Sequence, residues 1–153
     1  MRTERGLDRL VTFLDAVVAI AITLLVLPLI EVLGERDDEQ LGPLLADHLA
    51  QFGAFALSFV VIARLWLAHH RLTESVGAYD GLFAWVNLAW AFTIVLLPFS
   101  TQVIATFGTD RLSVGLYVGT VLASSAATTV LVTLLHRRAP LRRRGAPQRG
   151  VVT

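Results

Sequence analysis

RLVTFLDAVVAIAITLLVLPLIEVL, residues 9–33, is an almost wholly apolar stretch that decides how this chain folds. Between Leu10 and Leu33 the polar side chains are Thr12, Asp15, Thr23 and Glu31. As an α-helix rising ~1.5 Å per residue, the stretch is ~36 Å long, which is enough to cross the hydrocarbon core of a bilayer. It therefore predicts a membrane-spanning helix over residues 10–33.

The composition extends this prediction to the whole chain. Of 153 residues, 55% are hydrophobic, which is too apolar for an ordinary soluble domain. Long apolar runs predict four transmembrane helices, over residues 10–33, 49–67, 81–107 and 112–135. We expect an all-α, polytopic helix bundle over residues 1–135, and the absence of cysteine excludes disulfides and thiolate chemistry.

The charge distribution predicts the orientation. Acidic residues gather between Glu31 and Asp47, whereas residues 136–153 form an arginine-rich tail. Four spans put both termini on one side, and the positive-inside rule makes that side cytoplasmic, in the cell inner (plasma) membrane. We expect the tail to be disordered and to anchor on lipid headgroups rather than on nucleic acid, because it lacks aromatic residues and a folded module.

One face of the first helix carries a distinctive set of side chains. At ~100° per residue, one sector contains Arg9, Phe13, Ala16, Ile20, Thr23, Leu24, Leu27 and Glu31. This sector runs from a cation, through aliphatic side chains and one hydroxyl, to an anion. It is consistent with a pore-lining face, and also with a lipid-facing helix whose two charges reach the interfaces.

Several spaced motifs indicate a family. Arg9-x-x-x-Phe13-x-Asp15 resembles the first-helix signature of the transmembrane protein 175 family, the bacterial homologues of the endosomal/lysosomal potassium channel, with Leu14 in place of the family's serine. Further matches follow in the family's order: Trp66-x-x-His69-His70-Arg71-Leu72, Trp85-Val86-Asn87-Leu88 and Leu97-Pro98-Phe99. The resemblance covers roughly residues 9–102.

This resemblance implies a potassium-selective channel subunit in a homotetramer, with the first helix lining the pore. The Ile20 position would then narrow the pore and the Thr23 position would contribute to selectivity, with Leu24 and Leu27 completing the constriction. Glu31 would repeat as a ring of carboxylates at the outer mouth. The alternative is that Thr23 bonds the carbonyl of Ala19 and the aliphatic side chains pack between spans.

Polar residues in the motifs are expected to form a buried network. Its predicted members are Arg9, Phe13, Asp15, Trp66, His69, His70 and Asn87. Leaving such groups unpaired in a low dielectric is costly, so the network would hold the first helix at a fixed angle, an architectural role rather than a catalytic one. We expect no enzymatic activity and no cofactor.

A metal site at the histidine pair is not expected. Adjacent residues on a helix point ~100° apart, so His69 and His70 cannot easily share one ion, and Glu74 would offer His70 only a weak second ligand. A pH-sensing role suits either histidine better. Two other functions remain open: a small proton-coupled secondary transporter, for which Asp15 is the only acid well inside a span, and a non-conducting membrane interaction protein.

Overall fold

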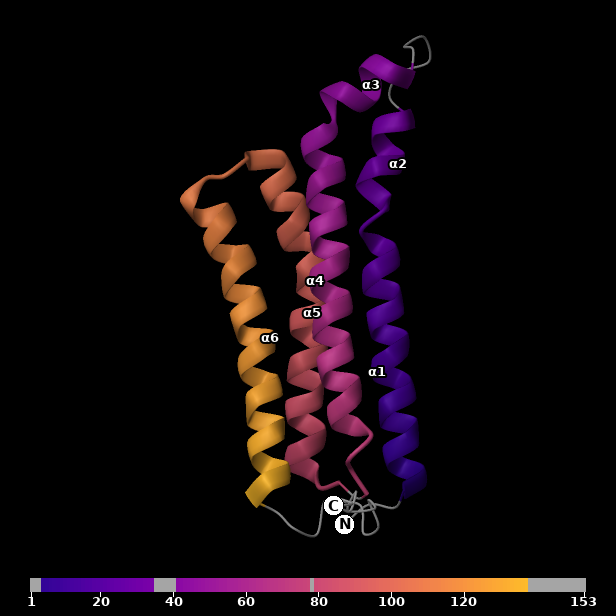
Figure 1. Ribbon diagram of the computed structural model, residues 1–153, viewed down its shortest axis with the longest axis vertical. Helices are drawn as coiled ribbons and strands as arrows, with labels where there is room; N and C mark the ends of the chain where they lie inside the picture. Colours follow the sequence, from indigo (N-terminus) through magenta and orange to yellow (C-terminus); the bar gives the residue numbers. More distant parts are fainter. Residues whose placement is uncertain (1–3, 35–40, 78, 138–153) are drawn as a thin grey trace, which may run out of the picture.

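The computed structural model describes residues 4–34, 41–77 and 79–137, which form an all-α bundle (Figure 1). Its helices are α1 Glu4–Leu24, α2 Leu27–Gly34, α3 Leu41–Asp47, α4 Leu49–Thr73, α5 Gly81–Phe107 and α6 Arg111–Arg137. Within the described ranges, four spans have the length and hydropathy to cross a membrane: α1 with α2, α4, α5 and α6. The predicted fold class is confirmed. Residues 136 and 137, expected at the start of the disordered tail, are instead the last two residues of α6, and the rest of the tail lies outside the described residues.

The first span differs from the single helix expected over residues 10–33. It begins earlier, at Glu4, and is interrupted between Leu24 and Leu27. Pro28 explains the interruption, because proline has no backbone N–H to donate to the carbonyl of Leu24 one turn back. At the break, the amides of Leu25 and Val26 donate to carbonyls three residues back, at 3.3 Å and 3.2 Å.

Helix α5 is the centre of the bundle. It packs against α1, α4 and α6, whereas α1 and α4 contact each other much less than either contacts α5 (Figure 1). The core around α5 contains Trp90 and Ile94 together with Leu14 from α1 and Ile62 from α4, all buried. The helix begins at a side-chain cap, because the Asp80 carboxylate accepts a hydrogen bond of 2.8 Å from the amide of Phe83.

Helix α4 continues beyond the expected end of its span. We expected a span over residues 49–67, but the helix ends at Thr73 and contains both His69 and His70. The expectation was wrong because hydropathy locates the hydrocarbon core rather than the end of a helix. No proline or glycine interrupts residues 68–73, and the Thr73 hydroxyl donates to the carbonyl of His70 at 2.8 Å.

The two ends of the bundle carry different elements. The start of α1, the end of α4 and the end of α6 lie together at the lower end in Figure 1. Helices α2 and α3 and the turn between α5 and α6 lie at the upper end. At this turn Gly108 has φ of 68°, a left-handed conformation that glycine adopts without steric cost. The described chain therefore begins and ends on the same side.

Candidate functional site

The polar and aliphatic face predicted on the first helix is exposed along its whole length. We call it the α1 stripe and define it as Arg9, Phe13, Ala16, Ile20, Thr23, Leu24, Leu27 and Glu31; every one of these residues is exposed. The exposed fractions of Ile20 and Leu27 are 59% and 50%. The stripe continues across the break, because its last two members belong to α2.

The opposite face of the first span packs into the bundle. Leu14, Val18 and Ala21 are each at most 3% exposed, and Leu25 at the break is 4% exposed. These side chains belong to the core cluster that also includes residues of α4 and α5. The α1 stripe is therefore not used to fold the chain itself, and it is free to face lipid, another protein or a pore.

Thr23 is the hydroxyl of the α1 stripe. Its Oγ1 donates a hydrogen bond of 2.8 Å to the carbonyl of Ile20, rather than to that of Ala19 as the alternative interpretation supposed. Since the hydroxyl proton is used within the helix, the oxygen presents only lone pairs to its surroundings. An acceptor oxygen on an exposed face is a group that can replace one water in the hydration shell of a cation.

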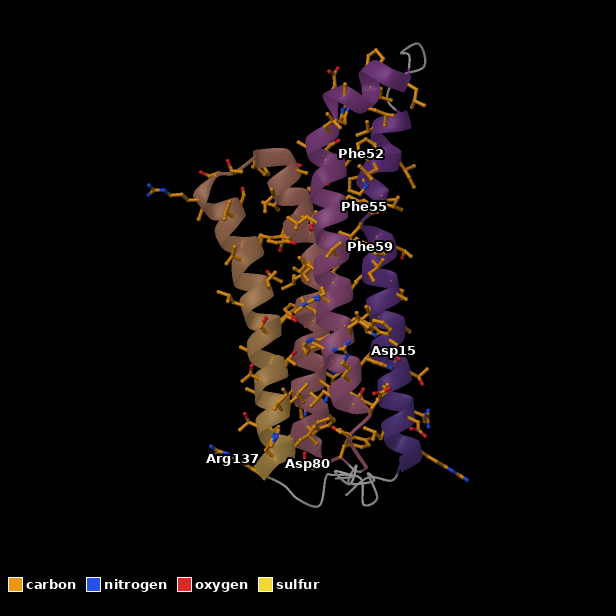
Figure 2. The ribbon with its side chains drawn as sticks, viewed as in Figure 1. Asp15, Phe52, Phe55, Phe59, Asp80 and Arg137 are labelled. Carbon is orange, nitrogen blue, oxygen red and sulfur yellow. The ribbon has the colours of Figure 1, made fainter. Side chains whose placement is uncertain are left out.

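Asp15 lies off the stripe, at the contact between α1 and α4 (Figure 2). The indole Nε1 of Trp66 donates a hydrogen bond of 2.8 Å to its Oδ1. The ring of His70 stacks on the same indole, with centroids 5.1 Å apart and planes tilted by 28°. This contact ties the first helix to the C-terminal part of α4 through one charge-assisted hydrogen bond.

His69 faces α5 instead. Its Nε2 lies 2.7 Å from Oδ1 of Asn87, whose Nδ2 donates to the carbonyl of Phe83 at 2.8 Å. Because the amide nitrogen of Asn87 is used in that bond, its oxygen faces the imidazole, and Nε2 of His69 carries the proton. The imidazole also stacks on Trp90 at 3.8 Å, and both rings are buried.

The predicted network thus consists of two separate clusters. Asp15, Trp66 and His70 join α1 to α4, whereas His69 and Asn87 join α4 to α5. The adjacent histidines serve different clusters because they project in different directions from one helix. The structure leaves Arg9 and Phe13 exposed on the α1 stripe, away from both clusters.

Sequence reasoning missed several polar contacts. Trp90 stacks on His69. The sequence held one indication of this contact, because Trp90 is three residues after Asn87 and therefore lies on the same face of its helix. A chain of hydroxyls also crosses the bundle: Thr101 donates to Ser58 at 2.7 Å, and Ser58 lies 3.3 Å from the hydroxyl of Tyr117. Hydroxyls in apolar spans often pair between helices, but sequence alone does not say which ones meet.

The histidine and acid at the end of α4 lie close together. Nε2 of His70 is 3.7 Å from a carboxylate oxygen of Glu74, one turn along the helix. Over residues 4–34, 41–77 and 79–137, no group of three or more His, Cys, Asp or Glu side chains is placed to hold a metal ion.

Comparison with known proteins assigns the family. The family model described as "Endosomal/lysosomal potassium channel TMEM175" matches residues 9–98, which is more than half of the chain. The chain belongs to the TMEM175 family. This family consists of ion channels rather than enzymes, and the matched segment contains the whole α1 stripe and both polar clusters.

Individual relatives support the same assignment. A potassium channel of Chryseobacterium sp. is 33% identical over 129 residues, covering 84% of this chain and 65% of the relative. The endosomal/lysosomal proton channel TMEM175 of Mus musculus is 31% identical over 137 residues, covering 86% of this chain and 27% of the relative. The chain therefore spans about a quarter of the mouse protein and just under two thirds of the bacterial one.

A solved structure of a TMEM175 homologue has the same fold. The crystal structure of a lysosomal potassium-selective channel TMEM175 homolog from Chamaesiphon minutus superposes with a TM-score of 0.72 and 28% sequence identity. The match covers 88% of this chain and 74% of that chain. The four-span bundle described above is thus a TMEM175-family fold.

Proposed function

We propose that this chain is one subunit of a potassium-selective channel, in which the α1 stripes of four subunits surround a central pathway. The single observation that carries the proposal is the continuous exposure of the α1 stripe, while the opposite face of α1 packs into the bundle. One helix cannot enclose a pathway, so the stripe requires further copies of the chain around a symmetry axis. The number of copies rests on analogy with the family.

The aliphatic members of the stripe would form the constriction. Ile20, Leu24 and Leu27 are 59%, 45% and 50% exposed, so in a ring they would present a narrow apolar neck. A cation crossing such a neck must lose part of its hydration shell, and the acceptor oxygen of Thr23 lies within the same segment to replace it. Potassium is favoured over sodium there because its hydration shell is held less tightly.

The ends of the bundle give the proposed orientation. Arg5, Arg71 and Arg137 belong to the end where α1 begins and α4 and α6 end, whereas Glu31 and Asp47 belong to the opposite end. The positive-inside rule places the arginine end in the cytoplasm of the cell, with the pore entrance near Glu31 on the outer side. Membrane lipids would cover the apolar faces that neighbouring subunits leave open.

Purified protein in planar bilayers tests the proposal. With unequal potassium chloride on the two sides, the reversal potential should follow the potassium gradient, and replacing potassium by sodium on one side should shift it. Saturable uptake driven by a proton gradient would indicate a transporter instead. If bilayers that contain verified oligomer carry no current, the protein is a non-conducting interaction protein.

Proton permeation is a second candidate, because the mouse relative is named a proton channel. The same bilayers distinguish it when potassium is equal on both sides and a pH difference of one unit is imposed. A proton-selective pathway then gives a reversal potential near 59 mV at about 25 °C, and a potassium-selective one gives a value near zero.

A further inference from the structure

A small cavity lies behind the break in the first span. Its walls include Leu25 and Leu29 at the break, Gln51 and Ala54 on α4, and Pro98 on α5, and its volume is about 20 Å³. Phe55, which also lines the cavity, lies on α4 at the level of the break (Figures 1 and 2). A single water molecule needs ~10–15 Å³, so the cavity has room for one water and little more.

One wall presents an acceptor without a donor. The side-chain oxygen Oε1 of Gln51 is buried and receives no hydrogen bond from any described residue. A buried polar atom in this condition is uncommon, because leaving it unpaired costs the free energy of removing it from water. Gln51 lines the cavity, so a donor to this oxygen would have to lie in the cavity.

The break supplies a second acceptor. The amide of Leu29 donates at 3.0 Å to the carbonyl of Val26, three residues back, and so does not donate to the carbonyl of Leu25, four residues back. Leu25 lines the cavity and is 4% exposed, so bulk solvent does not reach it freely. An unpaired carbonyl inside a membrane span is unfavourable unless a side chain or an ordered water satisfies it.

We propose that this cavity binds one ordered water molecule, which donates one proton to Oε1 of Gln51 and the other to the carbonyl of Leu25. A water molecule has two protons and the site has two acceptors short of a donor. A cation fits the site poorly, because none of the residues lining the cavity carries a charge and an uncompensated buried ion is far more costly than a water. The water thus bridges α4 to the break.

This water site deepens the proposed channel function and rests on it for its consequence. The break separates Thr23 on α1 from Leu27 and Glu31 on α2, so the angle between the two helices sets how the outer half of the α1 stripe faces the pathway. A water that joins Gln51 to the break holds that angle from behind the stripe. It supports the constriction without entering the ion pathway.

The first test measures whether a substitution raises or lowers the melting temperature, and it requires no measurement of ion current. In Gln51→Leu the bridging water loses an acceptor, so the melting temperature of the detergent-solubilised protein should fall by about 2–4 °C, the shift that one lost hydrogen bond gives a chain of this size. If Oε1 is instead unpaired, leucine removes an unsatisfied polar atom and the protein melts at the same or a higher temperature. That result would overturn the proposal.

A matched control separates this effect from polarity in general. Thr129→Val removes a hydroxyl from an exposed position of α6, away from the cavity, and should leave the melting temperature unchanged. An equal fall in both variants would mean that Gln51→Leu acts through something other than the bridge. The proposal would then be wrong.

The second test locates the water directly. An experimental structure that resolves solvent should show one peak about 2.5–3.0 Å from both Oε1 of Gln51 and the carbonyl oxygen of Leu25. No peak there, or an anomalous signal at that position from crystals grown in rubidium, would overturn the proposal. Failure of the channel function appears separately, as the absence of potassium current in bilayers, and leaves the solvent peak and melting data unaffected.

Discussion

The hydrogen bond between Trp66 and Asp15 should be a main link between α1 and α4. Its N···O distance is 2.8 Å, and it joins an indole N–H to a partly buried carboxyl group. A hydrogen bond to a charged group contributes ~1.5–3 kcal/mol to stability. Because α1 contacts α4 at few other places, we expect Asp15→Ala to lower the yield of assembled oligomer as well as its stability.

A double-mutant cycle isolates this bond from the other effects of each substitution. Trp66→Phe, Asp15→Ala and the combined variant are compared with the parent protein by thermal melting in detergent, followed by size-exclusion chromatography. The coupling energy should be ~1.5–3 kcal/mol. The melting temperature of the combined variant should therefore be about 3–12 °C higher than the value calculated by adding the shifts of the two single variants.

Trp85→Phe is the matched control for the aromatic change. Trp85 lies on α5 with 72% of its surface exposed, and its removal should cost little. Strictly additive single variants, with normal oligomer yield from Asp15→Ala, would show that the bond does not hold α1 in place.

Three further substitutions test the candidate site and the bundle behind it. Ile20→Asn should raise conductance or weaken potassium-over-sodium discrimination, because amides wet an apolar neck; unchanged single-channel currents and selectivity would remove Ile20 from the pathway. Glu31→Gln should reduce inward current at low salt and lose this effect toward ~1 M salt, where the screening length is ~3 Å, with the reversal potential nearly unchanged; a salt-independent current would place Glu31 away from the mouth. Thr101→Val should destabilise the protein by ~1–3 kcal/mol, because Ser58, which is only 1% exposed, loses the hydroxyl that donates to it. In thermal melts, adding Ser58→Ala should recover part of that loss. Fully additive effects of the two substitutions would contradict the pairing.

The sequence was sufficient to predict four spans and the residues that share the exposed face of α1, although not the ends of every helix. Long apolar runs have few alternatives to membrane helices, and a helical turn of ~100° per residue fixes which side chains share a face. Pro28 also signalled the break, although the apolar run around it suggested one continuous helix. These features depend on the chemistry of residues that are close together in the sequence.

Side-chain partners were harder to predict because they depend on how helices rotate against one another. His69 and His70 are adjacent and chemically identical, yet one meets Asn87 on α5 and the other stacks on Trp66 beside α1. The end of α4 at Thr73 was missed because membrane hydropathy says little about helix that extends into the interface. The sequence also could not predict that the side-chain oxygen of Gln51 is buried without a donor among the described residues, because burial depends on how the helices pack.

The central position of α5 has a consequence for biosynthesis. During translation α1, α2 and α4 leave the ribosome first, and α1 and α4 have only a small surface with which to recognise each other. Their main partner, α5, is the third span to be made, so the early hairpin must wait in the lipid with its core-facing side chains uncovered. The arrival of α5 supplies the surface on which α1 and α4 come together, and α6, made last, then packs on the same helix.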